Sequence, residues 1–260
     1  MGAPAPRGEW LNGGLPDRHP ALIAFWDFQD EGVRRSRAGE PYALREGGPA
    51  VPRVQAPGAP FGPCAADLAE GGWLAIPRRE CPRLDIHGAG GRLTVLAWIR
   101  RRRKSLRHCE FIAGQWNETN RGRQYGLFLN IGTWHGEDQI CGHVSRTGGP
   151  TAGYKYCMDG AIGATAVGWD AWHCVGMSYD GVQAYAWLDG RLDRHEGLNP
   201  YPYAGGLHDG GPDGSDFTVG GVHRSGEMGN WYCGLLGGLA VFAEALSPAE
   251  IWALAQARTP

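Results

Sequence analysis

The sequence predicts an all-β protein, a single sandwich of two antiparallel sheets that ends in one short helix. Three observations support this fold class. The 43 Gly and 18 Pro residues are spread along the 260-residue chain, as expected for many short strands joined by turns. Runs of strand length, rich in aromatic and β-branched residues, lie between these turns. No strand alternates with a long helical pattern, which excludes a parallel βαβ fold.

The clearest strand signal is a hairpin at residues 169–190. Two runs of aromatic and β-branched residues are separated by Asp180-Gly181, and Asp189-Gly190 ends the second run. Asp-Gly tolerates the positive φ angles of a tight hairpin, so these residues predict strand, turn, strand and turn. In the second strand, alternation places Tyr185 and Trp187 on the face opposite a small apolar face.

The remaining elements follow in order along the chain. Residues 1–20 are predicted to be an irregular lead-in to one domain at 21–260. Residues 33–63 are expected to form loops with one or two short strands, and 193–215 a long polar loop, a length that is often functional. The other predicted strands are residues 21–28, 65–68, 72–77, 93–100, 110–116, 124–131, 139–145, 154–157, 216–220 and 234–242.

Some of these strands carry an expected position or partner. The strands at 65–68 and 72–77 are predicted to form a hairpin, and those at 124–131 and 139–145 a pair. The 93–100 run is the most continuously apolar and is predicted to be central. The basic run at 100–104 is interpreted as a solvated turn, with a patch for an acidic ligand as the alternative.

A helix is predicted to close the chain. Ser247 is expected to cap it, with Pro248 at the first helical position and Glu250 at the third, ahead of the apolar residues 251–254. This spacing is a capping box.

Charge and composition exclude several classes of partner. The formal net charge of −2 gives no electrostatic case for nucleic acid or for an anionic membrane surface. No apolar run approaches the roughly 20 residues that span a bilayer. The beginning of the sequence lacks the apolar segment of a signal peptide, and the 7 Cys are an odd number without a CxxC pair. We therefore expect mostly reduced, buried thiols and a cytoplasmic protein, and leave the oligomeric state open.

An ordered set of short motifs resembles a known family. The chain is similar to the laminin-G-like branch of the concanavalin A-like lectin/glucanase superfamily over roughly residues 21–255. The motifs that carry the resemblance are Phe25-Trp26-Asp27-Phe28, Ala66-Asp67, Gly72-Trp73-Leu74-Ala75-Ile76-Pro77, 93–99, 111–114, 125–127, 172–176, 187–190, 217–221, 234–242 and 245–251.

The resemblance implies a jelly-roll sandwich with ligands bound across its concave sheet or the rim of that sheet. It also implies a structural Ca²⁺ in many relatives, often with an acidic residue on the last strand. Here Gly237-Gly238 stands where such relatives commonly have Asp or Glu, which puts the calcium in doubt. Asp27, Asp30, Glu31 and Asp67 are the candidate oxygen ligands.

The strands and loops from 111 to 157 are dense in polar and aromatic side chains. If these share the concave face, they line a groove suited to an oligo- or polysaccharide, because aromatic faces stack on sugar C–H groups while amides and Arg bind hydroxyls or carboxylates. Each has an ordinary structural interpretation as well: a sheet His is often only hydrogen-bonded, and Trp beside loops often caps a core. The predicted ligand-binding residues are Trp116, Asn117, Arg123, Asn130, Trp134, His143, Arg146, Tyr185 and Trp187.

Three functions remain open. The first is a lectin-like carbohydrate-binding protein. The second is a polysaccharide lyase, which needs a group to neutralise the uronate, a base and an acid. The third is a protein-interaction platform, which a dry apolar groove would favour. A retaining glycosidase is disfavoured because no strand carries the alternating carboxylates of that mechanism. The candidate lyase residues are His143, Tyr156, Tyr154, Arg123 and Gln124.

Overall fold

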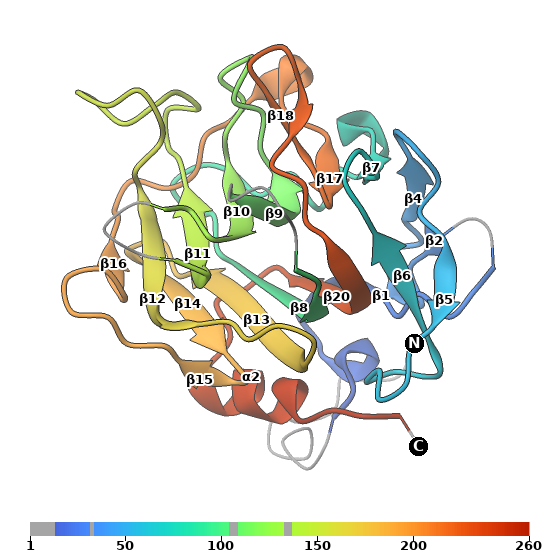
Figure 1. The fold of residues 1–260 in the computed structure, drawn as a ribbon. Helices are drawn as coiled ribbons and strands as arrows, with labels where there is room; N and C mark the ends of the chain where they lie inside the picture. Colours follow the sequence, from blue (N-terminus) through green and yellow to red (C-terminus); the bar gives the residue numbers. More distant parts are fainter. Residues whose placement is uncertain (1–13, 32–33, 104–108, 133–136, 260) are drawn as a thin grey trace.

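The computed structural model describes residues 14–31, 34–103, 109–132 and 137–259, which fold into a sandwich of two antiparallel sheets (Figure 1). The predicted all-β architecture with a short C-terminal helix is confirmed. Neighbours in the ten-stranded sheet follow the order β15 (Arg191–Leu192), β14 (Gln183–Leu188), β13 (Trp172–Tyr179), β8 (Leu93–Arg101), β20 (Gly234–Phe242), β1 (Leu22–Trp26) and β3 (Ala38–Gly39). Three more strands join this sheet at its sides: β16 (Tyr201–Pro202), β6 (Cys64–Leu68) and β5 (Arg53–Gln55).

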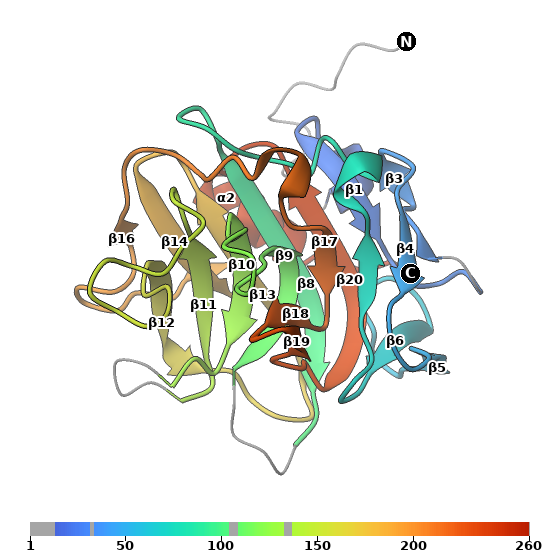
Figure 2. The same cartoon turned by 90° about the horizontal axis from the view of Figure 1, so that it is seen from above.

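The second sheet has eight strands, and a small separate hairpin lies on it. Its strands follow the order β12 (Gly160–Ala166), β11 (Gln139–Val144), β10 (Tyr125–Leu129), β9 (Glu110–Gln115), β17 (Phe217–Val219), β7 (Leu74–Ile76), β4 (Ala43–Glu46) and β2 (Arg34–Arg35). The hairpin consists of β18 (Val222–Arg224) and β19 (Glu227–Gly229), which lie in front of this sheet in Figure 2. The remaining elements are the 3₁₀ turns η1 (Pro16–Arg18), η2 (Arg78–Glu80) and η3 (Gly211–Asp213), and the helix α2 (Pro248–Ala255).

Alternation along the strands separates three layers. Val175, Met177 and Tyr179 point from β13 into the core between the sheets. The opposite face of the ten-stranded sheet is covered by α2, whose Ile251 and Leu254 belong to a second apolar cluster on that face. Among the described residues, no helix covers the outer face of the eight-stranded sheet.

The predicted pairings of β13 with β14 and of β10 with β11 are confirmed, and β8 lies between β13 and β20 as a central strand. The capping box of α2 is also confirmed. The Ser247 hydroxyl accepts a hydrogen bond from the Glu250 amide at 3.3 Å, and the Ser247 amide donates to Glu250 Oε2 at 2.7 Å.

Three expectations about individual elements are wrong. Strands β6 and β7 form no hairpin, because the turn between them carries the chain from one sheet to the other. Residues 154–156 form a bend and Cys157 belongs to no regular element, and the edge strand is β12 at 160–166 instead. The segment 33–63 holds four short strands, β2 to β5, where one or two were expected.

The basic run at 100–104 departs from the expected solvated turn at Arg101, whereas Arg102 and Arg103 are exposed and Lys104 lies outside the described residues. Arg101 continues the inward alternation of β8, and its side chain is fully buried. It forms ion pairs with Glu110 at 2.6 Å and with Asp138 at 2.7 Å, and its guanidinium lies 3.7 Å from the Trp169 ring centroid. Because Glu110 belongs to the other sheet, this pair joins the two layers.

Six of the seven Cys side chains are buried, as predicted for thiols packed in an interior. No helix in the described ranges is long and apolar enough to cross a membrane.

Candidate glycan-binding site

A pocket of about 240 Å³ lies on the outer face of the eight-stranded sheet. Strand alternation builds it: Phe128 and Cys141 are paired across β10 and β11 and point outward, whereas Leu127 and Ile140 point into the core. The lining residues are Cys109, Trp116, Glu118, Phe128, Ile131, His143, Tyr156, Cys157, Met158, Arg224 and Asn230.

Three buried rings in mutual contact form the floor of this pocket. The Trp116 ring centroid lies 5.7 Å from that of Phe128 and 5.3 Å from that of His143, and the last two are 5.2 Å apart. The contacts that involve Phe128 are edge-to-face, a favoured geometry for aromatic rings. No described residue accepts a hydrogen bond from the Trp116 indole nitrogen, which is itself buried. The floor therefore offers an apolar surface and an unused N–H donor.

His143 is neutral and has a defined tautomer. Its Nδ1 lies 2.9 Å from the Asp159 carbonyl oxygen, which only accepts, so Nδ1 carries the proton. No described residue hydrogen-bonds Nε2, which is left as an acceptor. Burial lowers the pKa of His143 to about 4, against the weaker opposing effect of Asp159. At neutral pH the pocket thus contains an uncharged imidazole.

Asp159 holds this imidazole and the adjacent loop in place. Its carboxylate accepts hydrogen bonds from the Thr151 hydroxyl at 2.7 Å and from the Tyr201 hydroxyl at 3.0 Å. Thr151 in turn accepts a hydrogen bond from the Met158 amide at 2.8 Å. The segment that brings Tyr156, Cys157 and Met158 to the pocket is therefore fixed at its end.

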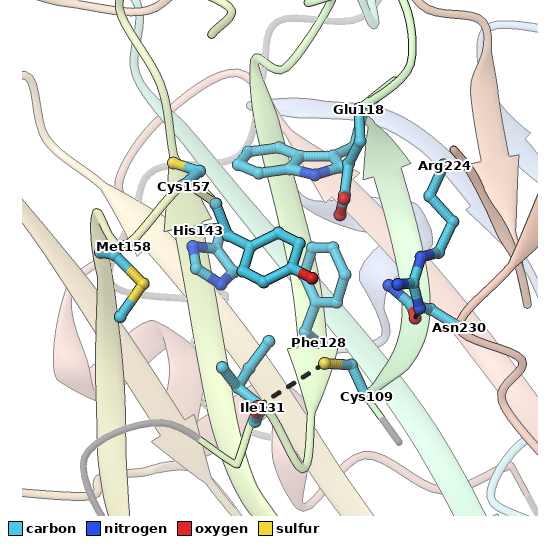
Figure 3. Close-up of a pocket in the computed structure, with 11 residues that line it drawn as sticks. Cys109, Glu118, Phe128, Ile131, His143, Cys157, Met158, Arg224 and Asn230 are labelled. Atoms are coloured by element: carbon cyan, nitrogen blue, oxygen red, sulfur yellow. Dashed lines mark hydrogen bonds between the residues drawn. The ribbon is translucent and has the colours of Figure 1, made fainter. Parts of the chain in front are cut away.

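Polar groups converge on the pocket from the β18–β19 hairpin and the β9 end. Figure 3 shows Arg224 and Asn230 on one side of the pocket and His143 and Met158 on the other, with Phe128 between them. Arg224 donates a hydrogen bond to Asn230 Oδ1 at 2.7 Å and contacts no carboxylate among the described residues. Asn230 has a φ of 53°, a left-handed conformation that Asn tolerates better than most residues.

Glu118 contributes a carboxylate to the same pocket. A buried cation, Arg123, lies 3.8 Å from Glu118 Oε2. Burial lowers the pKa of the Arg123 guanidinium, which also donates to the Gly148 carbonyl at 3.3 Å. Arg123 does not line the pocket, so its contact with Glu118 comes from a residue outside the lining.

Among the residues predicted to bind a ligand, Trp116 and His143 line the pocket, and so does Tyr156 from the predicted lyase set. Tyr156 is 47% exposed. Trp134 lies outside the described residues. These placements do not themselves test ligand binding, which stays a prediction for each of the three.

The other predicted polar residues have structural partners away from the pocket. Asn117 accepts a hydrogen bond from the Asn120 amide within its own turn, and Asn130 accepts one from the Asp138 amide. Arg146 donates to the Ala204 carbonyl. Tyr154 is 51% exposed and is not part of the pocket lining.

Gln124 was expected in the groove but is fully buried elsewhere. Its side chain accepts a hydrogen bond from Arg78 and donates to Asp85 Oδ1 at 3.0 Å. Because these partners saturate the amide, Gln124 belongs to the packing beneath a neighbouring loop.

The expected extension of the groove by Tyr185 and Trp187 is wrong. Both point to the outer face of the ten-stranded sheet, where they pack in the cluster that contains Ile251 and Leu254 of α2. The Trp187 indole donates to the Ser178 hydroxyl at 2.9 Å. Alternation along β14 was assigned correctly, but this face belongs to the other sheet and is covered by the helix.

Two of the predicted calcium ligands have cationic partners. Asp27 forms an ion pair with Arg37 at 2.9 Å, and Asp67 forms one with Arg102 at 2.6 Å, while Asp30 is exposed. Within the described ranges, no group of three or more His, Cys, Asp or Glu side chains is placed to hold a metal ion. Because calcium also takes backbone carbonyl oxygens, calcium binding stays a prediction.

Several pocket residues were missed at the level of sequence. Phe128 was detectable, because alternation puts it on the same face of its strand as Gln124 and Asn130. Arg224 and Asn230 had no local signal, since they reach the pocket from a hairpin about 100 positions away in the chain. Glu118 was passed over within a polar loop.

Burial of His143 predicts a specific pH dependence of stability. Its pKa is about 4 in the folded protein and 6.5 ordinarily, so the unfolded chain binds more protons between these values. The free energy of unfolding should fall by roughly 3 kcal/mol as the pH drops from 6.5 to 4 on account of this residue alone. Urea unfolding of the wild type and His143→Phe at several pH values measures the effect. The difference between the two should shrink or reverse toward pH 4, and parallel curves would contradict the assignment.

Comparisons with known proteins support the fold. No protein-family model matches the sequence, and no curated protein matches it. Domain 4 of AbnA, a GH43 extracellular arabinanase from Geobacillus stearothermophilus, solved with arabinotriose, has a TM-score of 0.60 and 14% identity, with 90% of this chain and 98% of that chain covered.

Two further solved structures are similar over most of the chain. Trypanosoma rangeli sialidase in complex with sialic acid has a TM-score of 0.57 and 15% identity over 93% of this chain and 34% of its own. The binding domain of botulinum neurotoxin serotype G has a TM-score of 0.56 and 12% identity over 90% and 50%. The chain thus spans about a third of the sialidase and half of the neurotoxin domain. At these identities, the comparisons establish the β-sandwich fold.

Proposed function

We propose that the protein is a laminin-G-like carbohydrate-binding domain that takes a glycan into the pocket floored by Trp116 and Phe128. The observation that carries this proposal is the combination, in one pocket, of a buried aromatic floor with Glu118, Arg224 and Asn230 on its walls. A sugar presents apolar C–H faces and a ring of hydroxyls, and this pocket offers a partner for each.

The size of the pocket limits what it accommodates. At about 240 Å³ it is smaller than the roughly 300–1,000 Å³ of pockets for drug-sized ligands. We infer that one sugar unit occupies it. The neutral His143 accepts a hydroxyl hydrogen, Arg224 donates to ring or hydroxyl oxygens, and Glu118 accepts from hydroxyls.

The structural neighbours favour the same class of ligand. The arabinanase domain was solved with arabinotriose and the sialidase with sialic acid. Because the likeness is one of fold, it supports a glycan in general and neither of these sugars in particular.

A lyase is the second candidate, because His143 and Tyr156 line the same pocket. In that reaction His143 Nε2 would remove the proton from the carbon next to a uronate carboxylate. The C–O bond to the leaving sugar would then break as a C=C bond forms. Tyr156 would donate a proton to the leaving oxygen. A pKa of about 4 makes His143 a weak base at neutral pH. Gln124 and Arg123 do not line the pocket, and this favours binding over catalysis.

The test is an assay of binding and turnover on one panel. The protein is exposed to arrayed glycans that include arabinan, sialylated oligosaccharides and uronate polysaccharides, and absorbance is followed for new unsaturated ends. Saturable retention without turnover is expected. Turnover that is lost in His143→Ala while retention persists would replace the binding function by the lyase. Retention of no glycan would overturn both and leave the protein-interaction platform.

A further inference from the structure

A second cavity, of about 380 Å³, adjoins the proposed binding pocket at the β18–β19 hairpin. Two residues line both cavities, Arg224 and Asn230. Their 2.7 Å hydrogen bond therefore lies where the cavities meet.

The hairpin is built so that the Arg224 side chain can lie across it. A Cβ at Gly229, which is paired with Val222 in this hairpin, would stand 3.1 Å from Arg224 Cδ. Because Gly229 has no side chain, the methylene groups of Arg224 can lie over it. The guanidinium then lies where the two cavities meet.

The second cavity also has an aromatic side chain, Trp231. Its ring lies against the backbone of Gly221, where a Cβ would approach ring atom Cζ3 to 2.5 Å. Trp231 is half-buried, and Met228 lies beside it in the lining. The rest of the lining includes two carboxylates, Glu70 and Glu227, a group that can accept hydrogen bonds from a ligand, as can the Glu118 carboxylate of the first pocket.

The two cavities thus repeat one set of chemical groups on either side of Arg224: an aromatic or thioether surface and a carboxylate, with a shared guanidinium and amide. We propose that they are two subsites of one groove, and that the ligand is an oligosaccharide of at least two sugar units that crosses Arg224. This inference rests on the proposed glycan-binding function. One unit occupies the pocket at Trp116, and the next lies beside Trp231.

Affinity should then depend on chain length. The probes are mono-, di- and trisaccharides of arabinose, galacturonic acid and glucose, titrated by calorimetry against the whole chain. In a series that binds, the disaccharide or trisaccharide should bind about tenfold more tightly than the monosaccharide, as expected for an added aromatic contact.

Variants of the second cavity should remove this gain alone. In Trp231→Ala the longer sugars should bind no more tightly than the monosaccharide, and the affinity for the monosaccharide should be unchanged. Trp231→Tyr should retain part of the affinity gained with chain length. Met228→Ala is a milder second variant, which should reduce the gain if Trp231→Ala does not fold. Trp252→Ala is the matched control, since Trp252 is 42% exposed on α2, on the opposite side of the sandwich.

The outcomes separate the two proposals. Equal affinity for all lengths in every series that binds, or a length effect unchanged by Trp231→Ala and Met228→Ala, would overturn the second subsite and leave glycan binding intact. Failure of every probe and of the wider glycan panel would overturn the proposed function itself.

Discussion

Replacing Trp116 with Ala should reduce the affinity for a bound glycan by at least about 30-fold, the effect of an interface residue worth roughly 2 kcal/mol or more. Trp116 provides the largest ring of the pocket floor and contacts both Phe128 and His143. Its loss removes the largest part of the apolar floor and opens the floor to water. Calorimetric titration with the sugar retained most strongly from the panel measures the effect.

The stability of this variant must be measured with its affinity. Trp116 is 2% exposed, and truncation of a buried Trp costs roughly 3–5 kcal/mol of folding free energy. Trp116→Phe is therefore the companion variant: it keeps an aromatic floor and removes the indole N–H, which no described residue uses. A folded Trp116→Phe variant should lose part of the affinity. Unchanged affinity in folded forms of both variants would show that the glycan binds elsewhere.

Local pattern predicted the strands and the outward direction of several side chains. His143 was found in this way, because alternation along β11 requires only neighbouring residues. Trp116 follows β9 and was selected as an aromatic side chain beside a loop. The same alternation placed Tyr185 and Trp187 correctly on the face away from the core. Alternation within a strand does not show which element packs on each outer face. Here α2 covers one outer face with residues about 65 positions further along the chain.

The polar residues on the pocket wall also could not be predicted from local sequence patterns. Arg224 lies in β18, and Asn230 follows β19. Two isolated bridges, Phe111 to Trp231 and Asn117 to His223, connect this segment to β9 and to the loop after its end. These bridges depend on backbone pairing between distant segments, which leaves no periodic mark in either one. The charged run at 100–104 is a related case. Its composition indicated solvent, but alternation from Ile99 continued one step further and placed Arg101 inside.

Replacing Arg101 with Met should destabilise the protein by roughly 3–5 kcal/mol, because it removes the guanidinium that pairs with the buried Glu110 carboxylate. Both side chains have no exposed surface, and the same guanidinium binds Asp138 and the Val167 carbonyl. Arg102→Met is the matched control. Arg102 forms an ion pair with Asp67, and their side chains are 48% and 24% exposed, respectively. Because exposed ion pairs contribute little, this change should lower the free energy of unfolding by less than about 1 kcal/mol.

Double substitution tests whether the cost comes from the stranded charge. Arg101→Met combined with Glu110→Met removes both charges, and replacing a buried ion pair by apolar side chains is often close to neutral. The double variant should therefore be more stable to urea than Arg101→Met alone, although Asp138, 23% exposed, still loses its partner. If Arg101→Met is no less stable than Arg102→Met, the ion pair does not hold the two sheets together. A different outcome is that Arg101→Met is destabilised while the Glu110→Met substitution restores no stability. In that case the cost arises from the lost contacts with Val167 and Trp169. The guanidinium then acts mainly as a packing and hydrogen-bonding group at this end of the sandwich.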